Sequence, residues 1–180
     1  NSSPLISEIA DVSGYEDIPV TIELTAIDLE GDTITFSAKS SDVSILLTVT
    51  GNSLTLTPSK DWYGTSSITV YANDGSSRDF TTFAVTFEAV NDAPKFKSKP
   101  NKNAIANITD YSYTVIVTDV DNNDDSLSIL AQKFPNWLTF DGISTISGKP
   151  DSTDVGEDTV IFEVSDGLLV TAQSFFIQVF

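Results

Sequence analysis

The sequence predicts an all-β protein built as two tandem β-sandwiches, over residues 1–90 and 91–180. Three observations predict this fold class. Short motifs recur at a spacing of about 90 residues, which indicates two copies of one unit. Apolar and polar residues alternate with a period of two, which is typical of half-buried strands. No stretch has the i, i+3, i+4, i+7 spacing of apolar residues that an amphipathic helix requires.

Three sequence landmarks recur in the same order and place the boundary between the units near residues 90–94. They are a proline after an Asn-rich tetrapeptide, the start of an acidic run, and the aspartate of an Asp-Gly turn. The pairs, separated by 90, 91 and 92 residues, are Pro4 and Pro94, Asp28 and Asp119, and Asp74 and Asp166. The second acidic run covers residues 119–125. Order and nearly constant spacing together indicate tandem units.

Each unit contains several short segments of alternating apolar and polar residues, rich in β-branched and aromatic side chains. Gly, Asn, Asp and Pro separate these segments, as expected of turns between strands. In the first unit the predicted strands include residues 20–26, 33–38, 54–57 and 68–72. In the second they include residues 111–117, 160–164 and 175–179. Roughly seven such strands in about 90 residues is the pattern of an immunoglobulin-like sandwich.

Composition and charge exclude several classes of function. The chain has 180 residues and a formal net charge of −17, from 26 acidic and 9 basic side chains. This charge argues against a nucleic-acid partner, which needs a basic surface. Cys and His are absent, which removes thiolate nucleophiles, disulfides and the commonest zinc ligands. No apolar run is long enough to span a membrane, so we expect no membrane insertion.

We expect no enzymatic activity and no catalytic residues. A serine triad is excluded because the sequence has no histidine and no Gly-x-Ser-x-Gly motif. Residues 142–149 superficially resemble a phosphate-binding loop, but five residues separate the glycines and Pro150 replaces the required Ser or Thr. Paired carboxylates can cleave glycosides, but any acidic chain offers many such pairs.

The acidic runs contain candidate ligands for a hard divalent cation. Residues at i and i+2 of a strand point the same way, so Asp28 with Glu30, and Asp119 with Asp121, aim paired carboxylates at one point. In a sandwich the last hairpin lies at the same end, which brings Asp74 or Asp166 to the pair. Calcium takes six to eight such oxygens. The alternative is that these are solvated acidic turns, which Asp, Asn and Gly favour.

Specific motifs in both units resemble known extracellular repeats. The first unit resembles the bacterial cadherin-like tandem repeat, in residues 16–19, 26–32, 56–58, 61–64, 71–75 and 90–94. The second resembles the dystroglycan-type cadherin-like, or putative Ig, repeat, in residues 118–121, 135–141, 147–150, 154–156 and 164–167. The resemblance implies stalk or adhesion modules of large bacterial surface proteins, or accessory modules beside secreted polysaccharide-degrading enzymes.

The resemblance also implies Ca²⁺ sites at the ends of the units. An interdomain site would use the linker, the start of the second unit and the far end of the first, with ligands Glu16, Asp61, Asn91, Asp92, Asp119, Asp121 and Asp166. Glu16 lies in Glu-Asp-x-Pro, which resembles the cadherin Glu-Asn-x-Pro motif. A second, half-built site at the N-terminal end would use Asn1, Asp28, Glu30 and Asp74. The linker is one residue shorter than its cadherin counterpart, which affects the expected number of ions.

Two further groups of residues have alternative interpretations. Trp62, Tyr63, Trp137 and Phe140 can stack on sugar rings, but large aromatic side chains usually form small sandwich cores. We expect Trp137 and Trp62 in the cores, with one of the adjacent Trp62 and Tyr63 exposed. Residues 95–99 hold three of the nine basic side chains. We expect an edge strand there, where lysines discourage pairing with other sheets; the alternative is a docking patch for an acidic partner.

The sequence therefore predicts a non-catalytic, calcium-rigidified stalk or adhesion module located outside the cell or on its surface. Asn1 occupies the same repeat position as Asn91, so we expect a fragment of a longer secreted protein, with neighbouring repeats as partners. A surface protein is a further candidate partner. The alternative function is a carbohydrate-binding accessory module of a secreted polysaccharide-active protein, with a polysaccharide as ligand.

Overall fold

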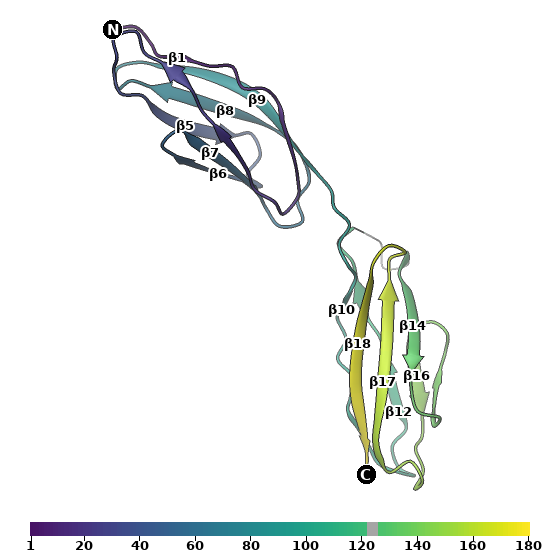
Figure 1. Cartoon of the computed structure of the whole chain (residues 1–180). Coiled ribbons are helices and arrows are strands. Elements are labelled where there is room, and N and C mark those ends of the chain that lie inside the picture. The colour runs from purple at the N-terminus through teal and green to yellow at the C-terminus, as the bar shows by residue number, and fades with distance from the viewer. Residues whose placement is uncertain (122–125) are drawn as a thin grey trace. The chain divides into compact units, whose positions relative to one another are not determined.

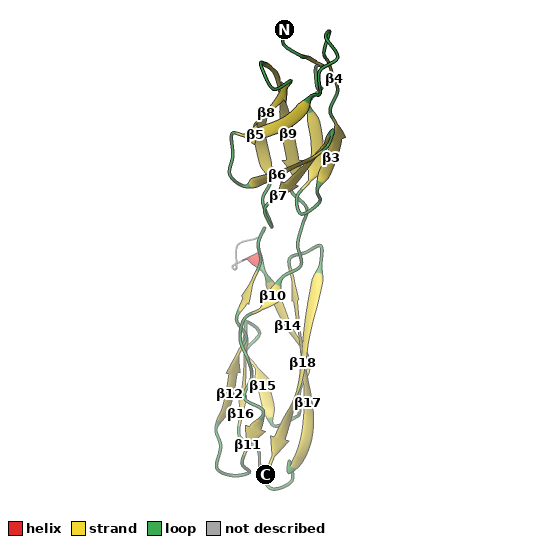
Figure 2. Ribbon diagram, turned by 90° about the vertical axis from the view of Figure 1, so that its left-hand side faces the viewer, coloured by secondary structure: helices red, strands yellow, loops and turns green. Residues whose placement is uncertain are grey.

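The computed structural model describes residues 1–121 and 126–180 and divides the chain into two compact units, Asn1–Val90 and Asn91–Phe180. Both units are built from β-strands (Figure 2), which confirms the predicted all-β fold class. Residues 122–125 of the second acidic run lie outside the described residues. In the described part of the chain, no helix has the length and apolar character needed to cross a membrane.

Unit 1 contains a four-stranded sheet, a three-stranded sheet and a separate short strand pair (Figure 1). Its strands are β1 (Leu5–Ile6), β2 (Val12–Tyr15), β3 (Val20–Glu23), β4 (Ala26–Ile27), β5 (Thr35–Ser40), β6 (Ile45–Thr50), β7 (Ser53–Pro58), β8 (Gly64–Asn73) and β9 (Arg78–Glu88). The sheet orders are β2-β9-β8-β5, β3-β7-β6 and β1-β4. Strand β2 runs parallel to β9, whereas the other pairs are antiparallel.

The core of unit 1 follows from the period-two alternation of its strands. Alternate residues of each strand point to the same face, so one face of each sheet is apolar and buried. The long hairpin β8–β9 supplies much of this face, with Ile68, Val70 and Ala72 on one strand and Val85 and Phe87 on the other. Leu54 and Leu56 of β7 cover it from the opposite sheet. The outward residues of the same strands are mostly hydroxyl-bearing or charged.

Unit 2 repeats this arrangement. Its strands are β10 (Lys95–Phe96), β11 (Asn103–Ala104), β12 (Tyr111–Thr114), β13 (Val117–Thr118), β14 (Ser128–Lys133), β15 (Leu138–Phe140), β16 (Thr145–Gly148), β17 (Gly156–Ser165) and β18 (Val170–Val179). The sheet orders are β11-β18-β17-β14, β12-β16-β15 and β10-β13. Strand β11 runs parallel to β18, as β2 does to β9 in unit 1.

Aromatic contacts are prominent in the core of unit 2. The ring of Tyr113 meets Phe162 and Phe175 edge-on, with centroids 6.0 and 5.5 Å apart. Such geometry places ring edges against ring faces and is favoured over face-to-face stacking. The Tyr113 hydroxyl and the Gln173 side chain lie 2.8 Å apart and form a hydrogen bond, so the polar end of this buried residue has a partner.

Two predicted strands are interrupted, and the interruption falls at equivalent points of the two units. The predicted strand over residues 20–26 ends at Glu23, and β4 begins at Ala26. The backbone N–H of Leu24, between them, donates to the Asn52 carbonyl, and the side chain is buried. The predicted strand over residues 111–117 is interrupted in the same way at Val115, whose N–H donates to Ser144. In both cases the chain leaves one strand pairing and begins another.

The lysine-rich segment of residues 95–99 forms a strand only at its start, where β10 covers Lys95–Phe96. Strand β10 pairs with β13 in a sheet of two strands, and the N–H of Lys97 extends this pairing by donating to the Ile116 carbonyl at 2.8 Å. Lys97 and Lys99 are exposed. The docking role for this segment stays a prediction.

Close backbone contact at Gly148 generates a test of this packing. A Cβ atom at Gly148 would lie 2.0 Å from the carbonyl oxygen of Trp137, next to the paired strand β15. The backbone cannot move away from it without distorting the sheet. Gly148→Ala should therefore destabilise unit 2 by about 2 kcal/mol or more. Denaturant unfolding followed by Trp137 fluorescence, in a Trp62→Phe background, measures the change. Ser147→Ala at the neighbouring exposed position should change the stability little, and equal losses from both would contradict the packing argument.

Candidate functional site

The loop after β4 places the first candidate carboxylates at one end of unit 1. Oδ1 of Asp28 accepts hydrogen bonds from the N–H groups of Glu30 and Asp32, at 2.9 and 3.0 Å. This local turn fixes the orientation of the carboxylate. Its other oxygen, Oδ2, is buried and has no hydrogen-bond partner among the described residues. The turn therefore uses one oxygen of Asp28 and leaves the second removed from water.

The β8–β9 hairpin brings Asp74 to the same end. Oδ1 of Asp74 accepts the N–H groups of Ser76 and Ser77, both at 2.7 Å, and Oδ2 accepts the Asn1 side-chain amide at 3.0 Å. Gly75 has a φ of 93°, in the left-handed region that a glycine adopts without strain. The turn geometry therefore aims Asp74 back towards the first residues of the chain.

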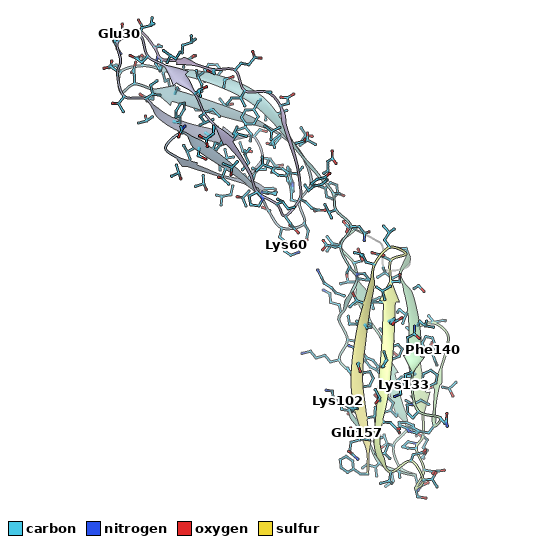
Figure 3. All side chains as sticks on the ribbon, in the orientation of Figure 1. Glu30, Lys60, Lys102, Lys133, Phe140 and Glu157 are labelled. Carbon is cyan, nitrogen blue, oxygen red and sulfur yellow. The ribbon has the colours of Figure 1, made fainter. Side chains whose placement is uncertain are left out.

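Glu30 connects the acidic loop to the N-terminal segment. Its carboxylate oxygens both lie 3.3 Å from the N–H of Ser2, which donates to them, and Oε1 lies 3.1 Å from the Ser2 hydroxyl. The predicted N-terminal set is thus brought together from three segments far apart in the sequence. Figure 3 shows Glu30 at this end of unit 1 and Lys60 at the opposite end.

The start of unit 2 has an equivalent arrangement. The Asn91 side-chain amide donates to Oδ2 of Asp166 at 2.8 Å, as Asn1 does to Asp74. Oδ1 of Asp119 accepts the N–H of Asp121 at 2.8 Å, as Asp28 does from Glu30, and Oδ2 of Asp119 is also buried. Oδ2 of Asp121 accepts the N–H of Asp92 at 2.6 Å. All five candidates that unit 2 contributes therefore lie in one hydrogen-bonded group.

Hydrogen bonds lower the pKa of the hairpin aspartates. The backbone N–H groups of Ser77 and Ser76 stabilise the ionised Asp74 and lower its pKa to about 2. The pKa of Asp166 is also lowered, chiefly by the backbone N–H of Leu169 and then by the Asn91 side chain. Both groups are therefore charged at neutral pH, and each is held in a fixed orientation before any ligand arrives.

The remaining predicted residues, Glu16 and Asp61, lie at the opposite end of unit 1. Glu16 is only 3% exposed, and its Oε1 accepts the N–H of Val90 at 2.6 Å. Asp61 donates its backbone N–H to Oδ1 of Asp17 at 2.8 Å, and its carboxylate contacts the Lys60 ammonium. The structure therefore places Asp17, which the sequence analysis passed over, beside Asp61.

The signal that could have identified Asp17 is the turn in which it lies. Glu16 alone was the expected ligand, because the resemblance of Glu-Asp-x-Pro to the cadherin Glu-Asn-x-Pro motif points to the glutamate. However, Asp17 has a φ of 63° and Asp61 has a φ of 57°, both in the left-handed region. Asp tolerates this region better than most residues, and the following Pro19 favours a turn.

The donor set of the N-terminal end fits a hard cation. Its functional groups are carboxylate and amide oxygens, and no Lys or Arg of the described residues forms an ion pair with Asp28, Glu30 or Asp74. Oxygen-only donor sets of this kind suit Ca²⁺. The buried oxygen of Asp28 strengthens the fit, because a carboxylate oxygen removed from water normally has a partner.

Other carboxylates have structural partners and offer no such opportunity. Asp11 accepts the N–H of Ala84, Asp79 accepts that of Ile6, and Asp158 accepts the indole N–H of Trp137. These side chains satisfy donors of the fold itself. The acidic composition therefore divides into residues that complete hydrogen bonds within the sandwiches and residues that gather at their ends.

The predicted core aromatics are confirmed, with one exposed neighbour. Trp62 packs against the unit 1 core and meets Phe87 edge-on, while the adjacent Tyr63 is 58% exposed. In unit 2, Trp137 meets Tyr111 edge-on and Phe140 meets Phe162. Trp137 also lines a hollow of about 340 Å³ beside Asp158. These contacts account for the aromatic residues as packing groups.

Comparison with known proteins identifies the repeat in both units. A family model described as "Bacterial Ig domain" matches residues 1–88 and 91–176. A structure of human protocadherin-24 EC1-2 is 18% identical, with a TM-score of 0.54; the match covers 99% of this chain and 98% of that one. Drosophila N-cadherin EC1-4 is 15% identical, with a TM-score of 0.50, and the match covers 99% of this chain and 50% of that one. These two cadherin structures share the fold.

A third solved structure belongs to an enzyme. An endo-fucoidan hydrolase of glycoside hydrolase family 107 is 25% identical, with a TM-score of 0.42. The match covers 98% of this chain and 28% of that one, so this chain spans less than a third of the length of the hydrolase. No curated protein matches the chain.

The hydrogen bonds to the hairpin aspartates generate a prediction for their titration. Asp74 should titrate near its folded pKa of about 2, below its ordinary value of 3.8. Its stabilising contribution is therefore present above pH 3.8 and is lost as the pH falls towards 2. Replacing Asn91 by Ala should raise the pKa of Asp166 towards the ordinary value, because one of its donors is removed.

Carboxyl-carbon NMR titration measures both effects residue by residue. Asp141 is the internal control for Asn91→Ala, because its lowered pKa depends on Thr145, Ile143 and Ser144 and not on Asn91. A shift of Asp141 as large as that of Asp166 would indicate a general structural change and would contradict the local explanation.

Proposed function

Because this chain belongs to the bacterial Ig domain family over both of its units, we propose that it is a non-catalytic, calcium-binding spacer of a larger extracellular protein. The family match and the cadherin-like fold confirm the resemblance to bacterial cadherin-like and Ig tandem repeats. Calcium binding, a stalk or adhesion role and a position at the cell surface are the parts that we propose here.

The observation that carries the proposal is the buried second oxygen of Asp28. A carboxylate oxygen that loses water without gaining a partner is unfavourable, and a bound cation removes that penalty. The carboxylates of Glu30 and Asp74 contact the adjacent residues Ser2 and Asn1 at the same end of the unit, and mutual repulsion of carboxylates gathered in this way also favours a cation. Solvated acidic turns alone do not require the second oxygen to be buried.

The residues that would hold the ion in unit 1 are Asn1, Asp28, Glu30 and Asp74. In unit 2 the equivalent set is Asn91, Asp92, Asp119, Asp121 and Asp166. Bound calcium would supply positive charge and a cross-link between the chain start, the acidic loop and the last hairpin. The protein prepares each set through backbone hydrogen bonds, which orient Asp74 and Asp166 in advance.

The expected setting is a bacterial cell surface or secretion product, with neighbouring repeats of the same polypeptide as partners. The chain contains no cysteine, so the disulfides that commonly stabilise proteins outside the cell cannot form in it. Extracellular calcium can fulfil that role, and modules of this kind need an affinity of only about 0.1–1 mM. Binding of this strength makes the stability of the spacer dependent on external calcium.

Calcium should raise the melting temperature of both units, because a ligand of the native state stabilises it. For a dissociation constant near 1 mM, about 10 mM calcium adds about 1.4 kcal/mol, which corresponds to about 5 °C or more for a domain of this size. Asp28→Asn should reduce this increase in unit 1 and Asp119→Asn should reduce it in unit 2. Asn preserves an oxygen for the local turn while removing the charge.

Differential scanning calorimetry with calcium or a chelator measures the increments. Asp151→Asn is the matched control, because Asp151 lies outside both sets and bonds to Thr153 in its own turn. Equal reductions of the calcium-dependent increase in melting temperature by all three variants would contradict the assignment of the calcium ligands. So would the absence of any such increase in the unmodified protein.

Sharing of the unit 2 ion with Glu16 and Asp61 stays the prediction made from the sequence, and it has a separate test. If those residues contribute, calcium should narrow the range of inter-unit arrangements detected by small-angle X-ray scattering, and Asp61→Asn should abolish the narrowing. Glu23→Gln, an exposed change on β3, is the control. Identical scattering with calcium and with chelator would exclude the rigid spacer while leaving calcium binding within each unit intact.

A further inference from the structure

The outward face of strands β5, β8 and β9, in the four-stranded sheet of unit 1, differs in charge from the rest of that unit. Residues 1–90 contain 13 acidic side chains and three basic ones. Two of the three, Lys39 and Arg78, are exposed on β5 and β9. Among the outward residues of these three strands, the single carboxylate is Glu88, at the end of β9 remote from Arg78. Strands β5, β8 and β9 lie side by side in Figures 1 and 2.

Aromatic rings lie between the two basic side chains. Arg78 places its guanidinium 4.9 Å from the centroid of the Tyr71 ring, within the range of a cation–π contact. Phe80 lies 6.1 Å from Tyr71 between centroids, tilted by 44°, and is 62% exposed. We call Lys39, Tyr71, Arg78 and Phe80 the basic–aromatic band. The contact with Tyr71 holds the Arg78 guanidinium near the exposed Phe80 ring and involves no carboxylate.

A hollow adjoins the band on the β5 side. It has a volume of about 280 Å³ and is lined by Lys39, Ser40, Ser41, Ser67, Thr69 and Tyr71. Register pairs Lys39 with Thr69 and Ser37 with Tyr71, so hydroxyl groups flank both the amine and the ring. An amine, hydroxyls and an aromatic ring around one hollow provide the charge, hydrogen bonds and apolar surface that an acidic sugar requires.

The two basic side chains of the band have no acidic partner in the described structure. No described carboxylate forms an ion pair with Lys39 or Arg78. Asp74, four residues before Arg78, directs its oxygens to Asn1, Ser76 and Ser77 instead. Both cations therefore remain available to an anionic ligand, in a unit where most of the surface repels one.

Three of the four equivalent positions of unit 2 hold other kinds of residue, while the fourth is again a lysine, because Lys133 pairs with Ile161 where Lys39 pairs with Thr69. Strand register places Glu163 opposite Ala172 where unit 1 has Tyr71 opposite Phe80. It places Val170 opposite Ser165 where unit 1 has Arg78 opposite Asn73. The two units share the acidic ends and this lysine, but unit 2 has neither the arginine nor the aromatic rings of the band. The band is therefore not a requirement of the sandwich fold.

We propose that the basic–aromatic band and its hollow bind an acidic polysaccharide. A sugar ring stacks on the exposed face of Phe80, and its sulfate or carboxylate groups accept hydrogen bonds from Arg78 and Lys39. Ser67 and Thr69 hydrogen-bond to sugar hydroxyls in the hollow. This binding is independent of the calcium proposal, and it gives a defined surface to the carbohydrate-binding function that the sequence left as an alternative.

The test is affinity electrophoresis of the full chain in native gels containing dextran sulfate, polygalacturonate or unmodified dextran. Chelator is present throughout, so that calcium cannot bridge the acidic protein to the polymer. One or both of the anionic polymers should retard the chain, and dextran should not. The double variant Lys39→Gln/Arg78→Gln should weaken the apparent affinity at least about tenfold, because each side chain contributes a charge-assisted hydrogen bond. Phe80→Ser should weaken it without changing the net charge.

The matched control is Lys97→Gln/Lys99→Gln, which removes the same charge from the lysine-rich segment of unit 2. Its affinity should stay within about twofold of the unmodified chain. Equal losses from the two double variants would show attraction by any cationic surface and would overturn the proposal. Absence of retardation by both anionic polymers, or retardation by dextran of equal strength, would also overturn it. Unchanged melting temperatures verify that the exposed substitutions leave the fold intact.

Discussion

Each unit depends on the pairing of its two longest neighbouring strands, β8 with β9 and β17 with β18. Because side chains alternate along a strand, one hairpin determines three regions at once. Its inner face forms the core, its outer face forms an exposed surface, and its turn presents an aspartate at one end. A register shift of one residue would exchange the inner and outer faces, so the core fixes both surface regions.

The turn also explains how an acidic chain can arrange its charges. Asp74 and Asp166 each use Oδ1 to accept backbone N–H groups of their own turn and Oδ2 to accept an asparagine amide. Their orientation is thus set by the hairpin and by the first residues of the unit. The carboxylates at the ends are consequently ordered groups, and an ordered group loses less freedom on binding an ion than a mobile one.

Sequence reasoning identified the fold class from local rules, and within each unit the candidates of the N-terminal end lie close together as expected. Alternation indicates the strands. Asp28 and Glu30 come together by a turn and not by the strand alternation expected, because both lie after the end of β4 and the Glu30 N–H donates to Oδ1 of Asp28. The strand interruptions at Leu24 and Val115 could not be predicted, because they depend on acceptors at Asn52 and Ser144, distant in the sequence. Asp17 was passed over because the motif resemblance that selected Glu16 carries no information on the left-handed backbone conformation in which Asp17 accepts the N–H of Asp61.

Net charge alone gives an incomplete description of the surface of unit 1. Many of its acidic residues lie at turns and ends, where backbone N–H groups can stabilise them, whereas Lys39 and Arg78 lie on the outward face of a sheet. Arg78 stays unpaired although Asp74 is close in sequence, because the turn directs the Asp74 oxygens away from it. The same hairpin therefore keeps an acidic end and a basic flank chemically separate within a single sandwich. Unit 2 keeps the acidic end but has neither the arginine nor the aromatic rings of the band, so the sandwich fold does not require the two features to occur together.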